Sequence, residues 1–481
     1  MGRLASYACT RRLFLRLLGV VYVVAFGSLL LQIAGLVGGD GILPAGIFFE
    51  KVHDRLGADA RWWLPSVCWW LGTGTPMLRA LCAAGIGCGV LLACDVAPLI
   101  AAGAAWALYL SLVVAGQVFL NFQWDALLLE TGLLALPLAP LRLRPRPHPG
   151  DWLPLLPLWL LVLKLHVLSG WVKIASGDPT WHDLTALRYH YWTTCLPVWL
   201  GWYADRLPLL AQQAAAAGMF AVELGAPWLI FGPRRLRHLA AVAMIGLQLA
   251  IALTGNYGFF NLLTIALCLT LLDDGALARW MPRSLPPPAS AAARLPALAR
   301  SLAAGVLAVL VLLPLLANVP AGRARPLVRS ALAALAPLRS FNGYGLFANM
   351  TTERPEIVIE GSDDGATWRA YELPWKPGDP AKRPRFVAPY MPRLDWQMWF
   401  AALQGHRQTY WFDPLLERLL EGSPPVLALF AEVPFPSRPP RLVRAVLYRY
   451  VFASPAEHAR GLWWHRELVG LYAPPRARRT P

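Results

Sequence analysis

Six ionisable side chains lie inside long apolar runs of the sequence, where a charge is costly and is usually paired or lines a polar cavity. They are Asp125, Glu130, Lys164, His166, Lys173 and Glu223. A helical rise of about 1.5 Å per residue places each acid at the depth of one base. The matched residues are Asp125 with Lys173, Glu130 with His166, and Glu223 with Lys164. Two interpretations stay open: structural ion pairs, or a polar chamber for a substrate or a proton relay.

No common catalytic motif accompanies these charges. The sequence has no Gly-x-Ser-x-Gly elbow, no phosphate-binding P-loop, no His-Glu-x-x-His and no Cys-x-x-Cys. We therefore predict no catalytic residue, no cofactor and no metal site, and an enzymatic activity is not the first expectation.

The apolar runs themselves predict a membrane-spanning bundle. Hydrophobic residues make up 57% of the 481 residues and charged residues 15%, against about 25% charged in ordinary soluble proteins. Runs long enough to cross a hydrocarbon core of about 30 Å end near residue 318. The predicted spans are 14–37, 76–95, 98–118, 125–141, 152–175, 209–232, 238–255, 256–273 and 299–317.

The net charge of +16 would suit a nucleic acid, but its distribution indicates a membrane. Basic residues lie in short clusters beside the spans, as the positive-inside rule requires, so we expect a lipid bilayer as partner and no nucleic acid. With the N-terminus inside, the clusters at 3–12, 142–146, 234–237 and 279–294 share one side. The ninth span then carries residues 319–481 outside, into a bacterial periplasm or the lumen of the endoplasmic reticulum.

Two of the outer segments, 38–75 and 176–208, are rich in Trp and Tyr, which settle at the level of lipid headgroups. We expect interfacial helices there. They are either plain anchors or a lid or protein-docking surface. Each segment holds one cysteine, Cys68 and Cys195, and a disulfide between them is one open alternative.

Beyond residue 319 the apolar pattern changes to that of strands. Residues 356–361 and 367–373 predict a hairpin around the turn 362–365. Further predicted elements are strands at 426–432, 441–452 and 463–470 and helices at 394–404 and 411–421. The chain is thus predicted to be an α+β membrane protein. A polytopic α-helical bundle of eight or nine spans occupies 1–318, and a soluble β-sandwich-like domain occupies 319–481.

Four long strings of residues resemble the lipase maturation factor family. They are Asn-Phe-Gln-Trp-Asp-x-Leu-Leu-Leu-Glu-Thr-Gly at 121–132, Ser-Gly-Asp-Pro-Thr-Trp at 176–181, Asn-Gly-Tyr-Gly-Leu-Phe at 342–347, and Pro-Arg-Leu-Asp-Trp-Gln-Met-Trp-Phe at 392–400. The resemblance runs from about 120 to 403 in the order of the family. It marks the following candidate client-facing or family-motif positions: Asp178, Trp181, Tyr189, His190, Asn342, Tyr344, Arg393, Asp395, Trp396 and Trp399.

The resemblance implies a multi-pass protein of the endoplasmic reticulum membrane that helps secreted lipases fold and assemble. A bacterial source would place it in the inner membrane and leave the client open. The leading hypothesis is a chaperone-like maturation factor for exported proteins, by resemblance lipases. The membrane half is more distantly similar to vitamin K-dependent carboxylase-like proteins. The alternative is therefore an intramembrane enzyme acting on a lipid or a protein side chain, with a chamber joining Lys164, His166, Glu130 and Glu223.

Overall fold

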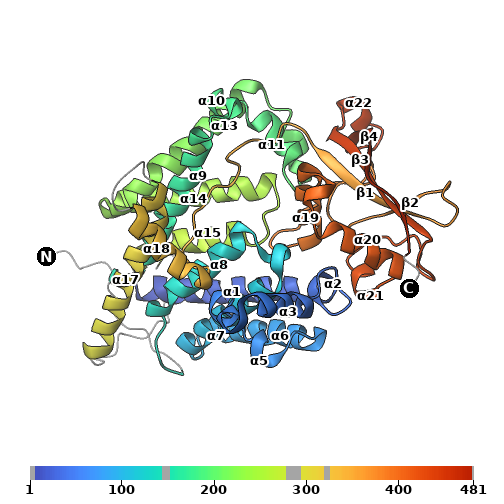
Figure 1. Ribbon diagram of the computed structural model, residues 1–481. Coiled ribbons are helices and arrows are strands. Elements are labelled where there is room, and N and C mark those ends of the chain that lie inside the picture. Colours follow the sequence, from blue (N-terminus) through green and yellow to red (C-terminus); the bar gives the residue numbers. More distant parts are fainter. Residues whose placement is uncertain (1–5, 144–151, 278–293, 319–324, 479–481) are drawn as a thin grey trace.

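Helices that run side by side fill most of the molecule, and a small sheet lies at one end of them (Figure 1). The computed structural model describes residues 6–143, 152–277, 294–318 and 325–478. We call the two ends of the helical bundle the sheet end and the far end.

Seven helical stretches of the described chain are long and apolar enough to cross a membrane, which confirms the predicted polytopic bundle. They are α1 (Ala8–Leu30), α6 (Thr75–Ala93), α7 (Pro98–Ala115), η4 with α9 (Leu153–Ala175), α13 with η5 and η6 (Leu209–Phe231), α14 (Arg234–Thr254) and Leu298–Leu316 within α17 (Arg294–Asn318). The other two predicted spans, 125–141 and 256–273, are shorter helices: α8 (Gln123–Ala135), which continues into η3 (Leu136–Leu138), and α15 (Phe260–Leu269).

The two shorter helices lie in the middle of the bundle, and most of their side chains are buried. A ten-residue helix such as α15 rises only about 15 Å, half of a hydrocarbon core. Their apolar composition therefore reflects contact with other helices, which a hydropathy pattern alone does not distinguish from contact with lipid.

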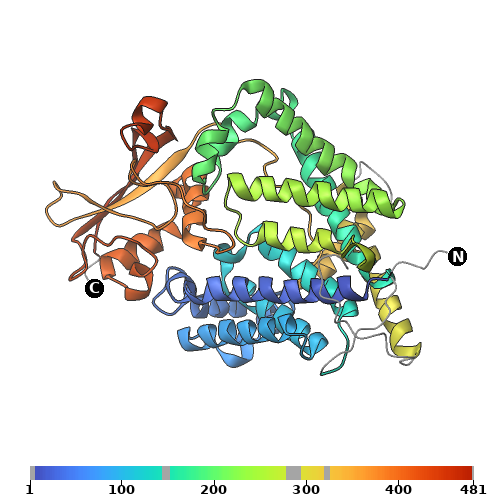
Figure 2. The same cartoon turned by 180° about the vertical axis from the view of Figure 1, so that it is seen from behind.

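The far end of the bundle gathers the short connections that carry basic residues. Arg12 pairs with Asp95 at 2.5 Å, and Arg234 pairs with Asp273. The first turn of α1 donates backbone N–H groups to Asp274. The basic clusters near the N-terminus and at 234–237 thus lie at one end, opposite the sheet (Figure 2). The cluster at 279–294 falls outside the described residues, apart from Arg294.

The two aromatic outer segments lie at the sheet end and differ in exposure. Residues 38–75 form α3 (Ala45–Leu56), η1 (Gly57–Asp59), α4 (Ala60–Trp63) and α5 (Cys68–Leu71), and residues 176–208 form α10 (Pro179–His182), α11 (Leu187–Thr193) and α12 (Trp199–Ala204). Trp62 and Trp70 in the first segment are 67% exposed, as a headgroup anchor requires. Trp202 in the second is buried, and its Nε1–H donates to Ala453 O. Cys68 and Cys195 are both unbonded, so the disulfide alternative is wrong.

The C-terminal sheet is antiparallel with the strand order β2-β1-β3-β4. The strands are β1 (Pro355–Ser362), β2 (Arg369–Tyr371), β3 (Leu442–Phe452) and β4 (Trp464–Ala477). The predicted hairpin is present, with Ile359 opposite Tyr371. Helices α19 (Arg393–Gln404) and α20 (Phe412–Glu421) lie between this sheet and the bundle (Figure 1). A β-sandwich has a second sheet packed on the first. Among the described residues of this domain, the layer that packs on the sheet consists of helices instead.

One predicted strand, 426–432, is wrong. Its first residues belong to α21 (Pro424–Leu427), and only Glu432 forms an isolated bridge, to Glu372. Pro424 and Pro425 account for the helical turn, because proline lacks an N–H and suits the first helical positions. The remaining short helices are α2 (Ile33–Val37), η2 (Gln117–Leu120), α16 (Asp274–Leu277), α18 (Arg325–Leu335), η7 (Ala336–Leu338), η8 (His406–Gln408) and α22 (Pro455–His458).

Between η7 and β1 the chain runs without regular structure alongside α8. Ser340 Oγ contacts Leu129 O, and Gly345 N–H donates to the side chain of Gln123. Irregular backbone at this depth is tolerated only where protein or a polar cavity satisfies its hydrogen bonds. Residues 340–350 therefore join the core of the helical bundle, although they belong to the C-terminal half of the sequence.

Candidate functional site

The first buried ion pair joins α8 to α19. Asp125 stands in the first turn of α8, and Arg393 in the first turn of α19. The Arg393 guanidinium donates to both oxygens of Asp125, at 2.6 and 2.8 Å, and the Tyr109 hydroxyl donates to the same carboxylate at 2.5 Å. Arg393 and Asp125 are at most 3% exposed. A planar fork on a carboxylate fixes orientation as well as distance, so this pair sets the position of α19 on the bundle.

The second pair lies five residues further along α8. Glu130 accepts from Lys164 of α9 at 2.5 Å, and both side chains are fully buried. The hydroxyl of Tyr344 donates to the other Glu130 oxygen at 2.6 Å. The backbone N–H of Asn342 is 3.4 Å from that oxygen. The irregular segment 340–350 is thus bound to the centre of the bundle by two groups on one carboxylate.

The third pair joins α9 to the bent helix that follows α13. Lys173 contacts both oxygens of Glu223, at 2.9 and 3.1 Å, and its ammonium lies 5.5 Å from the centre of the Trp181 ring. Glu223 sits in a π-helical turn, Ala221–Gly225, followed by the 3-10 turn Ala226–Phe231. π-Helical turns are rare in proteins as a whole, but those that occur are often found at functional sites. Here the turn faces Glu223 toward α9.

The structure brings all six predicted intramembrane residues into buried positions but changes their partners. Glu130 pairs with Lys164 instead of His166, Glu223 pairs with Lys173 instead of Lys164, and Asp125 takes Arg393. The depth matching failed because it considered only residues before 318. Arg393 comes from the C-terminal half and pairs with Asp125, which leaves Lys173 to pair with Glu223 and Lys164 to pair with Glu130.

A fourth buried cluster was not predicted. Glu356 on β1 contacts Arg354 at 2.7 Å and Lys376 at 2.9 Å. Arg354 also donates to the carbonyl oxygens of Trp192, Thr194 and Cys195, so it binds the end of α11 to the sheet. The signal in the sequence is the string Arg354-Pro355-Glu356, in which opposite charges flank a proline shortly after the third family string at 342–347.

The family-motif positions around residues 178–190 contact the segment 340–350. Asp178 caps α10 through Thr180 and accepts from the backbone N–H of Met350 at 2.6 Å. Although partial burial acts in the opposite direction, these hydrogen bonds hold the pKa of Asp178 below its ordinary value. The indole of Trp181 donates to Phe347 O at 2.9 Å. Tyr189 lies in the same small apolar cluster, half-buried.

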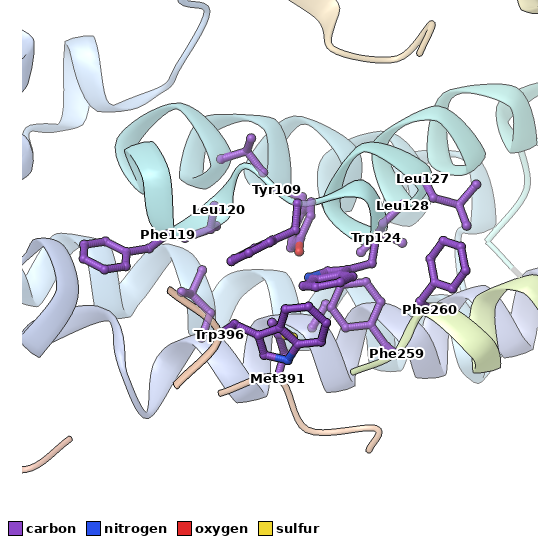
Figure 3. Close-up of a cluster of buried hydrophobic side chains, with 14 of the residues drawn as sticks. Tyr109, Phe119, Leu120, Trp124, Leu127, Leu128, Phe259, Phe260, Met391 and Trp396 are labelled. Atoms are coloured by element: carbon purple, nitrogen blue, oxygen red, sulfur yellow. The ribbon is translucent and has the colours of Figure 1, made fainter. Parts of the chain in front are cut away.

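The motif positions on α19 pack inward rather than toward solvent. Trp396 meets Trp124 of α8 edge to face, with ring centres 4.6 Å apart, and Figure 3 shows the two indoles among other buried aromatic and aliphatic side chains. Trp399 donates its N–H to Thr193 O at 2.9 Å. Asp395 accepts the backbone N–H groups of Trp375 and Lys376. The first two of these residues bind α19 to the bundle, and Asp395 ties the helix to the loop 374–392, so none of them presents a free surface to a client.

A cavity of about 190 Å³ lies beside the third ion pair. Its walls come from α9, α10, α11, α13, η5, α14, α15 and the segment 340–350. Most of the lining is apolar, and the polar groups on it are His166, Ser169, Lys173, His190, Tyr191, Glu223, Gln248, Thr254 and Tyr257. Burial, and then the charge of Lys173, lowers the pKa of His190 to about 4, so this imidazole is neutral at pH 7. Lys164 and Glu130 do not line the cavity, so it joins only two of the four residues of the predicted chamber.

Two family models match the chain, one over the helical bundle and one over the C-terminal region that contains the sheet. The model of the lipase maturation factor transmembrane domain matches residues 9–279, and that of the lipase maturation factor C-terminal domain matches 340–474. Lipase maturation factor 2 of Rattus norvegicus is 35% identical over 98% of this chain and 83% of its own length. The chain belongs to the lipase maturation factor family. Lipase maturation factor 1 of Mus musculus is 33% identical over 98% of this chain and 87% of its own length. No solved structure matches the chain.

The buried pairs of this lipase maturation factor family member connect its two matched regions. Asp125 and Glu130 belong to the first region, while Arg393 and Tyr344 belong to the second. In each case the acid contacts side chains of both regions directly. We call these contacts, which join the sheet to the bundle, the frame of ion pairs. Within the described ranges, no three His, Cys, Asp or Glu side chains are grouped as a metal ion requires.

Proposed function

We propose that the chain is a membrane-embedded maturation factor that holds exported, partly folded clients at its sheet end. The relatives are named as lipase maturation factors, which supports a lipase as the client class. The observation that carries this proposal is an open edge of the C-terminal sheet.

The open edge is strand β4, which pairs with β3 on one side and with no other described strand. Leu468, Val469 and Leu471 on this strand are between 54% and 66% exposed. Proteins usually protect such edges with charges, prolines or a covering segment. Pro474 and Pro475 protect the last residues of β4, whereas the stretch 468–473 has neither charge nor proline.

An exposed edge of this kind binds an extended peptide by adding it as a further strand. Main-chain hydrogen bonds supply affinity with little dependence on sequence, and exposed apolar side chains add contact area. A partly folded secreted lipase presents unpaired strand edges and apolar surface, which also make it prone to aggregate. Pairing with β4 would shield such a strand until the client completes its own sheet or its own subunit interface. The mechanism requires no covalent chemistry.

The position of the sheet supports this role. The basic clusters described above lie at the far end, and the positive-inside rule assigns that end to the cytoplasm. The sheet end would then face the lumen of the endoplasmic reticulum, or the periplasm if the source is bacterial. Exported lipases fold on that side of the membrane. The buried pairs hold the sheet against the bundle, so β4 stays close to the site where a translocated client emerges.

Substitution of β4 tests the proposal. Leu468→Lys with Leu471→Lys places two charges on the open edge without touching the buried face. We expect client capture to weaken about tenfold, as the loss of a central apolar contact does in other interfaces. The measurement is the activity of secreted lipase per amount of secreted lipase protein, in cells that lack the gene and carry the variant.

Tyr410→Lys is the matched control, because Tyr410 is an aromatic residue of the same half and 62% exposed, but lies outside the sheet. This variant should leave lipase specific activity unchanged. Normal specific activity with the β4 variant at equal expression would contradict the proposed edge. Normal specific activity after deletion of the whole gene, for every exported lipase, would contradict the maturation role itself.

A further inference from the structure

The cavity beside Lys173 and Glu223 contains polar groups that the frame of ion pairs does not use. His166 is 2% exposed, and its Nε2 has no hydrogen-bond partner among the residues that the structure describes. The other ring nitrogen, Nδ1, lies 2.9 Å from Val162 O. A carbonyl oxygen only accepts, so in a neutral ring Nδ1 carries the proton and Nε2 is a bare acceptor. His166 Nε2 can therefore accept a hydrogen bond from a donor group placed in the cavity.

A second histidine on the cavity wall is incompletely bonded in the same way. His190 Nε2 lies 3.1 Å from the Tyr257 hydroxyl, while its buried Nδ1 has no hydrogen-bond partner in the described part of the chain. The aromatic ring of Phe347 meets the His190 ring edge to face at 4.9 Å, which holds the imidazole in place. Buried polar atoms are normally bonded, and those that are not call for a missing partner such as a ligand. Two such atoms at one cavity indicate a polar head group between them.

The charges at the cavity select an uncharged head group. Lys173 is already neutralised by Glu223 at 2.9 Å, so the pair offers no net charge to an anion. Protonation of His166 would add a second cation seven residues from Lys173 on the same face of α9, in an apolar interior. A carboxylate or phosphate would also bring no donor for a neutral His166. A hydroxyl both donates and accepts, and therefore suits either tautomer of His190 as well.

The shape of the cavity indicates what carries this hydroxyl. About 190 Å³ is far more than the roughly 10–15 Å³ that one water needs, and most of the wall is apolar. Helices α13 and α14 meet at the far end and diverge toward the sheet end (Figure 2). The cavity lies between them, and Ala215 and Ala250 on its wall are exposed. Ala215 lies about 9 Å below the sheet end of α13, so the opening faces the hydrocarbon of the bilayer.

We propose that this cavity binds a neutral single-chain lipid with a hydroxyl head group, of the monoacylglycerol class, which enters from the bilayer between α13 and α14. The head group donates a hydrogen bond to His166 Nε2 and contacts His190 Nδ1. The acyl chain lies along the small side chains of α13 and α14. This site does not depend on the client or on strand β4.

Photolabelling of the full-length protein in lipid nanodiscs tests the site. The probe is a 1-monoacylglycerol with a diazirine on its acyl chain, and the labelled peptides are identified by mass spectrometry. We expect labels on α13 and α14. Unlabelled 1-monooleoylglycerol should compete, whereas oleate and a lysophosphatidic acid of the same chain length should not. Equal competition by the two anions would overturn the assignment of a neutral head group, and labels spread over all spans would overturn the site.

Two variants locate the lipid within the cavity. Ala215→Trp fills the opening and should reduce labelling at least fivefold. Ala217→Trp is the matched control, because Ala217 is exposed on the same helix but does not line the cavity. His166→Phe keeps the ring volume and removes the acceptor, so it should weaken competition by 1-monooleoylglycerol about five- to tenfold. Equal labelling of the two Trp variants, or unchanged competition in His166→Phe at an unchanged unfolding temperature, would overturn the proposal.

Discussion

At the scale of single residues, the buried acids of this protein differ in what stabilises their charge. Asp125, Glu130 and Glu223 each contact a cation directly. Asp395 instead accepts two backbone N–H groups on one oxygen, Oδ1, at 2.9 and 2.8 Å. Burial is the largest influence on it and raises its pKa to about 6, although these N–H groups act in the opposite direction. Asp395 is therefore a source of pH dependence outside the membrane.

The sign of this dependence follows from the two states. An unfolded Asp has a pKa of about 3.9, so between about pH 4 and pH 6 the folded state binds more protons than the unfolded state. Stability then falls as the pH rises through this window. The shift of about two pH units corresponds to about 3 kcal/mol. Asp395→Asn keeps an oxygen that can accept from both N–H groups and carries no charge. It should therefore remove the loss of stability between pH 4 and pH 6.

Unfolding temperatures in detergent between pH 4 and pH 7 measure the effect. Asp395→Asn should gain stability relative to the unchanged protein as the pH rises from 4 to 6. Asp54→Asn is the control, because Asp54 is exposed on α3 and should leave the pH profile as it is. A profile of Asp395→Asn that runs parallel to that of the unchanged protein would refute the role of this carboxyl.

At the scale of helices and strands, the contact between α8 and α19 depends on the Asp125–Arg393 pair. Asp125→Asn leaves a buried guanidinium without its counter-charge, which should lower the free energy of unfolding by about 3–5 kcal/mol. Asp363→Asn is the control, because the Arg438–Asp363 pair is largely exposed and should contribute at most about 1 kcal/mol. Hydrogen exchange of α19 should rise in the first variant only. Equal stability of the two variants would show that packing of Trp396 and Trp399 alone holds α19.

The elements show where the sequence is sufficient and where it is not. Spans such as α1 and α14 were predictable because a continuous apolar run of about 20 residues matches the thickness of the hydrocarbon core. The helices α8 and α15 were also placed correctly, although their regular helical parts are shorter than the predicted spans 125–141 and 256–273. Arg393 and Tyr344 stand out through the family strings. Their partners Asp125 and Glu130 lie in the first string. The pairing itself was not predictable, because a contact between residues more than 200 positions apart leaves no local pattern.

At the scale of the whole molecule, residues 319–481 are not an appendage of the bundle. Residues 340–350 lie along α8, Gln32 just before α2 donates to Met391 O, and Asn256 donates to Arg385 O. The predicted division at residue 318 is therefore crossed by many buried contacts. Because these contacts join the spans to the sheet, the orientation of the bundle in the membrane also decides on which side of the membrane strand β4 lies. The side on which β4 lies therefore decides whether it can meet an exported client.

Sidedness can be tested with cysteines at the two ends of the bundle. Cys94 is exposed at the far end, next to Asp95, whereas Arg460 is exposed beyond α22 at the sheet end. A membrane-impermeant maleimide added to sealed vesicles of known orientation should label Arg460→Cys only from the lumenal or periplasmic side. In the same molecules Cys94 should react only from the cytoplasmic side, so each site serves as the control for the other. Labelling of both from one side would refute a bundle that crosses the membrane between them. The reverse pattern would place β4 in the cytoplasm, where it meets no exported client.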